Sequence, residues 1–266
     1  MQKRNATKHD MNALEIISLS KTYHTGSVFS RKKTDVKALR EVSFSLEPGF
    51  YGLLGPNGAG KSTLMNIIVG TLKQDKGYVL WNGKSTARLG RSFRKDLGYM
   101  PQQQNLYDNY TGIRFLYYIA ALKGINKEDA AAEAERAAAT VNMTAHLGKT
   151  LGAYSGGMKQ RLLAAASIMG HPSLLIMDEP MAGLDPKERV HLRTVLADIA
   201  KEAIVLVATH VVPDIETVAD KVLILKQGQL HDMDSPEELI RRYDSSTGME
   251  GVYLRIFGTE DIDESS

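Results

Sequence analysis

A glycine-rich stretch constrains the fold of this chain more than any other feature of its sequence. It comprises Gly55, Pro56, Asn57, Gly58, Ala59, Gly60, Lys61 and Ser62, and Thr63 follows it. The stretch fits the pattern G-x-x-x-x-G-K-[ST] in full. The apolar run 50–54 precedes it, and the segment 62–69, which has helical character and ends at Gly70, follows it. The sequence therefore predicts a strand–loop–helix unit.

The residue types of this loop suit a phosphate group. Glycines let successive backbone N–H groups curl around an anion without Cβ clashes, and the following helix directs its positive end at the same anion. Lys61 can reach the β- and γ-phosphates of a nucleotide, and Ser62 can ligate Mg²⁺. The alternative is a glycine-rich turn that fits the pattern by chance, and the flanking strand and helix argue against it.

Apolar runs and helical patterns alternate along the rest of the chain. Strands are predicted at 15–19, 42–46, 50–54, 76–81, 174–177, 204–208 and 222–225, and helices at 128–141, 155–170 and 188–201. The last three apolar runs are continuous, as is typical of strands that are buried on both faces. The alternation predicts an α/β fold with a mainly parallel sheet, into which a mostly helical block from about residue 88 to 170 is inserted.

Other segments are predicted to be loops or extensions. The polar, basic stretch 25–37 lacks an apolar period, which indicates a loop, and Asn82-Gly83 is a hairpin-turn signal. Residues 1–12 are predicted to be a disordered leader and 13–243 the main domain. Residues 244–266 are predicted to be a C-terminal extension with an alternating patch at 252–257 and an acidic end.

Two acids stand directly after a predicted buried strand. Asp178 and Glu179 follow the run 174–177, and in open α/β sheets ligands sit at the carboxyl ends of the strands. We therefore expect Asp178 where the Mg²⁺ of a phosphate loop lies, and Glu179 is placed to polarise an attacking water as a general base. The pair alone could be an ordinary loop start, but the upstream phosphate loop favours the functional interpretation.

A second candidate phosphate site lies shortly before these acids. Ser155, Gly156 and Gly157 open a predicted helix, where a hydroxyl and free N–H groups attract anions. This site, within the sequence YSGGMKQR, resembles the signature of the ABC transporter nucleotide-binding domains, and the resemblance extends from about Leu14 to about Leu239. It implies a P-loop NTPase core with an antiparallel β-subdomain and an inserted helical subdomain. It also implies that the signature contacts the γ-phosphate of ATP held by the opposite subunit.

Four further positions match the family in order and spacing. Tyr23 resembles the aromatic residue that stacks on adenine, and Gln102 resembles the Q-loop glutamine that senses Mg²⁺ and the partner. Asp185 lies in a segment, 182–185, that resembles the D-loop, and His210 resembles the switch histidine that contacts the γ-phosphate. The resemblance implies that Gln102 is a third metal ligand beside the serine of the loop and the first of the two acids.

The chain departs from the family pattern in two places. Met158 stands where the usual signature, LSGGQ, has a glutamine, and similar YSGGM signatures occur in the ATPase subunits of exporters. The basic stretch 25–37 lengthens the usual gap after Tyr23. A solvated loop and a contact with anionic lipid headgroups are the two interpretations of this stretch. Aromatic residues also cluster at 106–118, where most are expected to form helical core and some to line a groove for a membrane subunit.

Composition excludes several other classes of protein. The 266 residues include no cysteine, which excludes disulfides, thiolate zinc sites and cysteine nucleophiles. A net charge of +2 gives no general attraction to nucleic acid. No apolar run approaches the roughly 20 residues that span a bilayer, and the first residues lack an apolar signal core. A cytoplasmic protein is therefore the default expectation, and the family resemblance implies that a permease holds it at the cytoplasmic face of the membrane.

The phosphate loop, the acid pair and the family resemblance together imply the ATP-hydrolysing subunit of an ABC transporter that drives export. Its expected cofactors are ATP and Mg²⁺, and its catalytic candidates are Lys61, Glu179 and His210. Its expected partners are a second copy of the chain, or a homologous ATPase subunit, and an integral membrane permease, but no nucleic acid.

Three alternatives compete with this prediction. A soluble ABC ATPase outside transport usually carries two cassettes or a coiled-coil insertion, and this chain shows neither. A kinase or GTPase is disfavoured because the chain carries the signature and lacks a guanine-reading N-K-x-D. A regulatory binder without catalysis is disfavoured because four residues are intact: Lys61, Asp178, Glu179 and His210.

Overall fold

The computed structural model describes residues 12–25, 34–102 and 106–258. The predicted leader, apart from Asn12, and the predicted acidic end lie outside the described residues, as does the part 26–33 of the basic stretch. Among the helices of the described ranges, none has the length and apolar character needed to cross a membrane.

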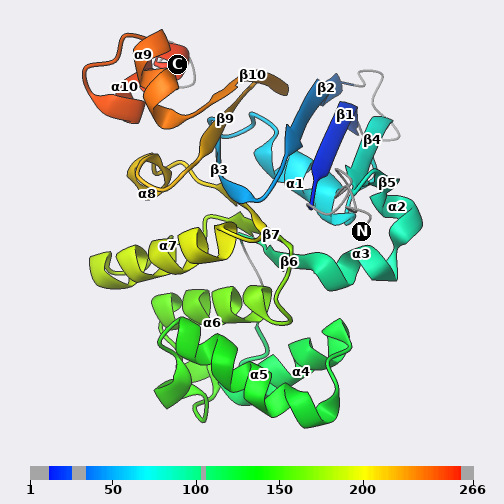
Figure 1. Cartoon of the computed structure of the whole chain (residues 1–266), viewed down its shortest axis with the longest axis vertical. Coiled ribbons are helices and arrows are strands. Elements are labelled where there is room, and N and C mark those ends of the chain that lie inside the picture. Colours follow the sequence, from blue (N-terminus) through cyan, green and yellow to red (C-terminus); the bar gives the residue numbers. More distant parts are fainter. Residues whose placement is uncertain (1–11, 26–33, 103–105, 259–266) are drawn as a thin grey trace, which may run out of the picture.

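A six-stranded sheet forms the centre of the molecule (Figure 1). Its strand order is β10 (Gln229–Asp234), β9 (Lys221–Lys226), β3 (Gly49–Leu54), β8 (Ile204–Ala208), β7 (Leu174–Asp178) and β6 (Leu97–Met100). All neighbouring pairs are parallel except β10 with β9. The predicted mainly parallel sheet is confirmed.

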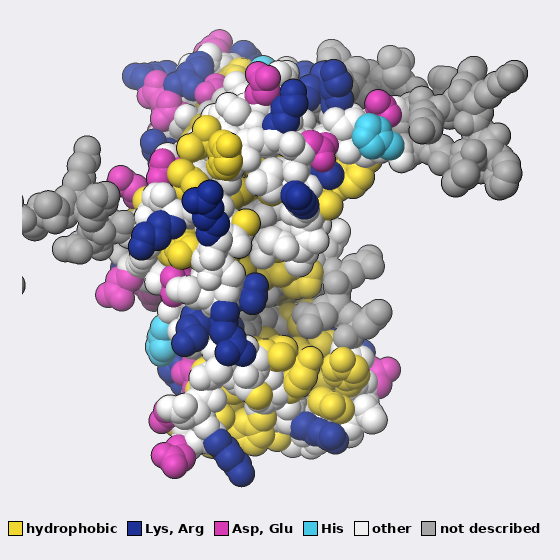
Figure 2. Space-filling model, turned by 90° about the vertical axis from the view of Figure 1, so that its right-hand side faces the viewer, with side chains coloured by type: hydrophobic (Ala, Val, Ile, Leu, Met, Phe, Trp, Pro, Cys, Tyr) yellow, Lys and Arg dark blue, Asp and Glu magenta, His cyan; other side chains and the backbone are white. Residues whose placement is uncertain are grey.

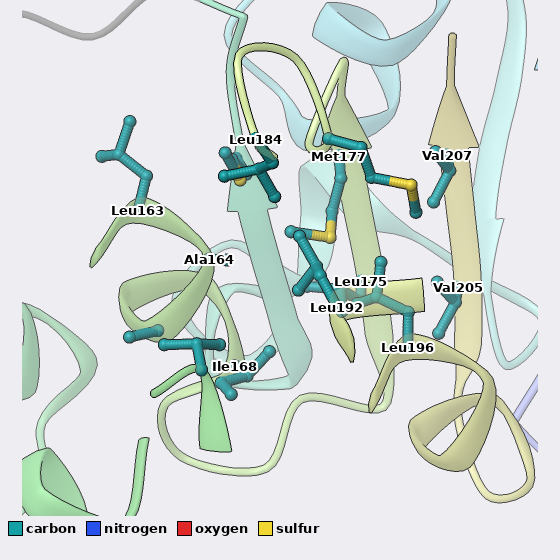
Figure 3. Close-up of a cluster of buried hydrophobic side chains, with 14 of the residues drawn as sticks. Leu163, Ala164, Ile168, Leu175, Met177, Leu184, Leu192, Leu196, Val205 and Val207 are labelled. Atoms are coloured by element: carbon teal, nitrogen blue, oxygen red, sulfur yellow. The ribbon is translucent and has the colours of Figure 1, made fainter. Parts of the chain in front are cut away.

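The sheet is covered on both faces, which explains its continuous apolar runs. In β8, Leu206 belongs to the hydrophobic cluster that contains helix α1 (Lys61–Val69), whereas Val205 and Val207 belong to the cluster on the other face. Helices α6 (Gly156–Ile168) and α7 (Pro186–Ala200) contribute to that second cluster, and their side chains meet those of β7 and β8 (Figure 3).

A second, antiparallel sheet packs against the α1 side of the core. Its strand order is β2 (Thr34–Leu46), β1 (Leu14–Thr25), β4 (Lys76–Trp81) and β5 (Lys84–Ser85). The predicted hairpin turn connects β4 to β5, where Asn82 and Gly83 have φ values of 51° and 72°. Two positive φ values in a two-residue loop are typical of the hairpin turn that matches strand twist. The antiparallel β-subdomain is confirmed.

A helical lobe lies on the opposite side of the main sheet (Figure 1). It contains α4 (Gly112–Lys123), α5 (Lys127–Thr140), the short 3₁₀ turns Thr144–His146 and Leu151–Ala153, and α6. Two further helices, α2 (Thr86–Leu89) and α3 (Arg91–Asp96), precede β6. In the aromatic cluster of this lobe, Phe115 is buried, while Tyr107, Tyr117 and Tyr118 are exposed.

Three further helices lie in the last part of the described chain. Helix α8 (Pro213–Glu216) lies between β8 and β9, and α9 (Pro236–Arg242) and α10 (Gly248–Phe257) follow β10. Met249, Val252 and Ile256 are buried at helical spacing along α10. The alternating patch at 252–257 is therefore the apolar face of a helix, with Leu254 and Arg255 exposed between its buried residues.

The predictions missed strands β5, β6 and β10 and the first part of β2. The segment predicted as a helical block also contains β6, whose four residues, Leu97–Met100, are too few to show a period. The loop predicted at 25–37 is wrong for Thr34–Lys37, because β2 begins at Thr34 and Val36 pairs with Tyr23 of β1. Val36 is half exposed on an edge strand, so no apolar alternation marks this end of β2. The domain limits predicted from the sequence stay predictions.

Helix α7 offers a matched test of the core. We expect Leu196→Ala to lower the free energy of unfolding by about 2–5 kcal/mol, because Leu196 is fully buried against the sheet and its removal leaves a cavity. Val190→Ala on the exposed side of α7 is the control and should change it by less than about 0.5 kcal/mol. Denaturant unfolding measures both, and equal effects would contradict the packing described here.

Candidate functional site

The glycine-rich loop follows the carboxyl end of β3, an inner strand of the main sheet, and joins it to α1. A Cβ atom on Gly55 would lie 2.4 Å from the carbonyl oxygen of Leu225, and one on Gly60 would lie 2.4 Å from that of Ala38. Gly60 also has φ 105°, a conformation that favours glycine. Both glycines are therefore required for the loop to fit between the two sheets.

Lys61 begins α1 and folds back over its own loop. Its Nζ donates hydrogen bonds to the carbonyl oxygens of Gly55 at 2.5 Å and Pro56 at 3.0 Å. Burial lowers the pKa of the Lys61 ammonium below its usual value, although the nearby Glu179 and Asp178 carboxylates oppose this shift. The Lys61 ammonium is thus partly desolvated and hydrogen-bonded to carbonyl groups of its own loop. It can exchange these partners for a bound anion.

Ser62 and Asp178 meet across the sheet. The Ser62 hydroxyl donates a hydrogen bond of 3.3 Å to Asp178 Oδ2 at the end of β7. Burial raises the pKa of the Asp178 carboxyl, the hydrogen bond from Ser62 opposes that rise and Glu179 adds to it. A hydroxyl and a carboxylate oxygen at this distance suit Mg²⁺, which commonly takes one or two protein oxygens and completes its shell with water and phosphate.

Glu179 is the most tightly held acid of the site. Its backbone has φ 51°, its N–H donates to the Ala208 carbonyl oxygen at 2.8 Å, and its own carbonyl accepts from Gln160 Nε2 at 2.7 Å. Its carboxylate accepts from Thr209 Oγ1 at 2.9 Å and from the His210 N–H at 2.9 Å. A non-glycine residue at positive φ is strained, and these hydrogen bonds fix its orientation.

His210 completes this arrangement. Its Nδ1 lies 2.6 Å from Glu179 Oε1, and its side chain is otherwise exposed. The histidine therefore stands at the mouth of the site with one ring nitrogen directed at the buried acid. A carboxylate and an imidazole in contact can hold and pass a proton.

An open cleft of about 520 Å³ connects these residues. Its walls are formed by Gly55, Pro56, Asn57, Lys61, Ser62, Gln102, Asp178, Glu179, His210 and Tyr253. Most of the residues predicted for the phosphate, metal and catalytic roles are thus brought together. The cleft is large enough for the phosphate groups of a nucleotide.

The predicted signature and D-loop residues lie elsewhere. Ser155 is the N-cap of α6, its Oγ accepts from the Met158 N–H, and Ser155 and Gly156 are exposed. Asp185 is the exposed N-cap of α7. A Cβ atom on Gly157 would lie 3.2 Å from the carbonyl oxygen of Gly183 in the D-loop segment. The signature and the D-loop segment are therefore neighbours, but neither lines the cleft of its own chain.

Tyr23 lies beside the beginning of α1. Its hydroxyl oxygen is 3.4 Å from Thr63 Oγ1, and 38% of the residue is exposed. Lys21 Nζ lies 5.9 Å from the centre of its ring. Tyr23 is not among the residues that line the cleft, and its role with adenine stays a prediction.

Sequence reasoning missed three residues of the site. Gln160 and Thr209 hold Glu179 in place. Gln160 stands inside the quoted signature and Thr209 directly precedes His210, so both could have been found from these motifs. Tyr253 belongs to the C-terminal extension, where no local motif indicates a site.

A parallel sheet whose strand ends gather a glycine cradle and two acids defines the class of P-loop nucleotide-binding domains. Residues 39–182, more than half of the chain, match the sequence model of the ABC transporter family, and the chain belongs to this family. ABC transporter A family member 3 of Arabidopsis thaliana is 34% identical over 214 residues. This match covers 79% of the chain and only 23% of the plant protein.

Solved structures share the fold. A structure described as the ATP-binding subunit of an ABC transporter has a TM-score of 0.78 and 25% identity, and the match covers 91% of this chain and 98% of that one. A dimeric ATP-binding cassette bound to ADP and Pi has a TM-score of 0.73 and 22% identity, with 84% of this chain and 98% of that one covered. These likenesses confirm the predicted ABC ATPase fold.

The raised pKa of Asp178 predicts a pH-dependent effect of Asp178→Asn. A folded-state pKa above the unfolded value of about 3.9 means that folding favours the protonated acid, so stability is lost as the pH rises through the folded-state pKa. Asparagine stays neutral. We expect the ligand-free variant to unfold at a higher denaturant concentration than the wild type at pH 7, and the gain to shrink as the pH falls towards 4.

Asp198→Asn is the control for this measurement, because Asp198 is exposed and pairs with Lys201 at the surface. Its effect should stay below about 1 kcal/mol at every pH. Both variants are compared in EDTA. A stability gain of Asp178→Asn that does not depend on pH would contradict the assignment to burial of a charged carboxyl.

Proposed function

We propose that the chain is the ATP-binding subunit of an ABC transporter and that it hydrolyses ATP at the interface of a head-to-tail dimer to drive export by a separate permease. One observation carries this proposal. The cleft gathers the phosphate-loop lysine, Asp178, Glu179 and His210, whereas the Ser155–Gly157 signature of the same chain lies outside it, with Ser155 and Gly156 exposed. A second copy can supply the missing wall.

Each protein group has a defined task in this mechanism. Lys61 moves from its own loop carbonyls to the phosphates, and Ser62, Asp178 and Gln102 hold Mg²⁺, which neutralises phosphate charge. Glu179 accepts a proton from the attacking water. His210 donates a hydrogen bond to the developing charge on the transferred phosphoryl group. Tyr23 stacks on the adenine beside α1.

A dimer completes two such sites by symmetry. The phosphate loop of one copy faces the signature of its partner, and the partner's phosphate loop faces the first signature. Asp185 and the D-loop segment accompany the signature, since they are its neighbours in the fold. The dimeric cassette with ADP and Pi supports this arrangement through its likeness in fold.

The permease is proposed to dock on the helical lobe. Tyr107, Tyr117, Tyr118 and Leu122 expose between 40% and 67% of their surface there, and Figure 2 shows hydrophobic side chains gathered on this lobe. An exposed apolar patch of this kind is typical of a protein contact. The chain would thus be peripheral at the cytoplasmic face of the membrane. The YSGGM signature supports export as the direction.

Glu179→Gln tests the proposed general base. The amide keeps an acceptor for Thr209 but cannot take a proton, so we expect ATP turnover to fall by about 10²–10⁴-fold. ATP binding should persist, and size-exclusion chromatography should show an ATP-dependent dimer. Glu202→Gln, at an exposed position, is the control. Normal turnover of Glu179→Gln would remove this residue from the role.

A mixing experiment tests whether the site is shared between copies. Lys61→Ala should inactivate the phosphate loop. Gly156→Asp should inactivate the signature by placing a carboxylate in open space at the start of α6, where the fold can accept it. Each variant alone should lack ATPase activity.

An equal mixture should regain about a quarter of the wild-type activity, because half of the dimers are mixed and each carries one intact site. ATP turnover of the two variants and of the mixture measures this. A mixture as inactive as its components would show that the two motifs do not complement each other between chains.

A further inference from the structure

The C-terminal extension reaches the nucleotide cleft. Helix α10 places Tyr253 in the cleft wall together with the start of the phosphate loop, Gln102 and His210. The side chain is only partly buried against the neighbouring hydrophobic core. Tyrosine combines an apolar ring with a polar hydroxyl, so Tyr253 can pack against the core and still present a polar group to the cleft.

Helix α10 is fixed to the elements that carry the site. Its Met249 N–H donates to Glu216 Oε1 at 3.1 Å, and Glu216 ends α8, the short helix that follows His210. At its other end, Lys226 Nζ of β9 donates to the Ile256 carbonyl oxygen at 2.8 Å. The helix therefore has defined contacts at both ends, and the position of Tyr253 between them is set by the fold.

The chemistry of Tyr253 suits a phosphate oxygen. Its ring packs against Phe257 with centroids 4.6 Å apart, which supports the ring. The phenol hydroxyl is a neutral donor, so it can contact a phosphate without adding charge to a wall that already holds two carboxylates. Glu179, His210 and Gln102, which line the same cleft, are the residues proposed to surround the terminal phosphate.

We propose that Tyr253 is a nucleotide-contacting residue whose hydroxyl donates a hydrogen bond to the terminal phosphate of a bound nucleoside triphosphate. Helix α10 thereby favours the triphosphate over the diphosphate. The proposal rests on the proposed function, since it assumes that the cleft holds the nucleotide.

Tyr253→Phe in the full chain tests the proposal, because it removes the hydroxyl and keeps the ring next to Phe257. Calorimetric titration with Mg²⁺ and either AMP-PNP or ADP gives the two affinities. We expect the affinity for AMP-PNP to fall about tenfold, as for the loss of a hydrogen bond to a charged group, and the affinity for ADP to stay within about twofold of the wild type.

Leu254→Ala is the matched control, since Leu254 is the next residue of α10 and points away from the core with 64% exposure. It should bind both nucleotides like the wild type, and thermal unfolding should show that both variants are folded.

Three results would overturn the proposal: wild-type affinity of Tyr253→Phe for both nucleotides, an equal loss for both, or tighter binding of AMP-PNP. A wild-type chain that binds neither nucleotide would overturn the proposed function itself and this inference with it.

Discussion

The structure depends on the burial of two adjacent carboxylates at the end of β7. Asp178 and Glu179 are 6% and 8% exposed, and burial of charge is costly unless donors or cations compensate it. The compensation comes from other strands: Ser62 and Lys61 follow β3, while Thr209 and His210 follow β8. The two acids can therefore be accommodated only when β3, β8 and β7 are assembled side by side.

The strand order turns this requirement into a functional site. The neighbouring strands β3, β8, β7 and β6 run parallel, so their carboxyl ends meet at one edge of the sheet. Each end is followed by a different group: the phosphate-loop lysine after β3, His210 after β8, Glu179 after β7 and Gln102 after β6. Four distant segments thus contribute one wall each to the same cleft, and no single segment could form it alone.

The features that could be predicted from the sequence are those with a local pattern of residues. The phosphate loop and the acid pair have fixed spacings next to long apolar runs, and the structure brings them together as expected. Strand β6 and the start of β2 were missed because an edge strand buries few side chains and leaves a weak alternation. Tyr253 could not be predicted, because its place in the cleft depends on contacts of α10 with α8 and β9 that are remote in sequence.

The pKa shifts of Lys61 and Asp178 in the cleft have the same physical cause. Burial lowers the pKa of Lys61 and raises that of Asp178, so for both groups desolvation outweighs the attraction of the opposite charges nearby. The buried charges of Lys61 and Asp178 are therefore only partly compensated by each other and by their neighbours in the free chain. In the proposed function, a nucleotide would place anionic phosphates beside Lys61, and Mg²⁺ would place a cation beside Asp178. Binding of such a ligand would then raise the free energy of unfolding, because the added charges compensate the two buried groups of the folded chain.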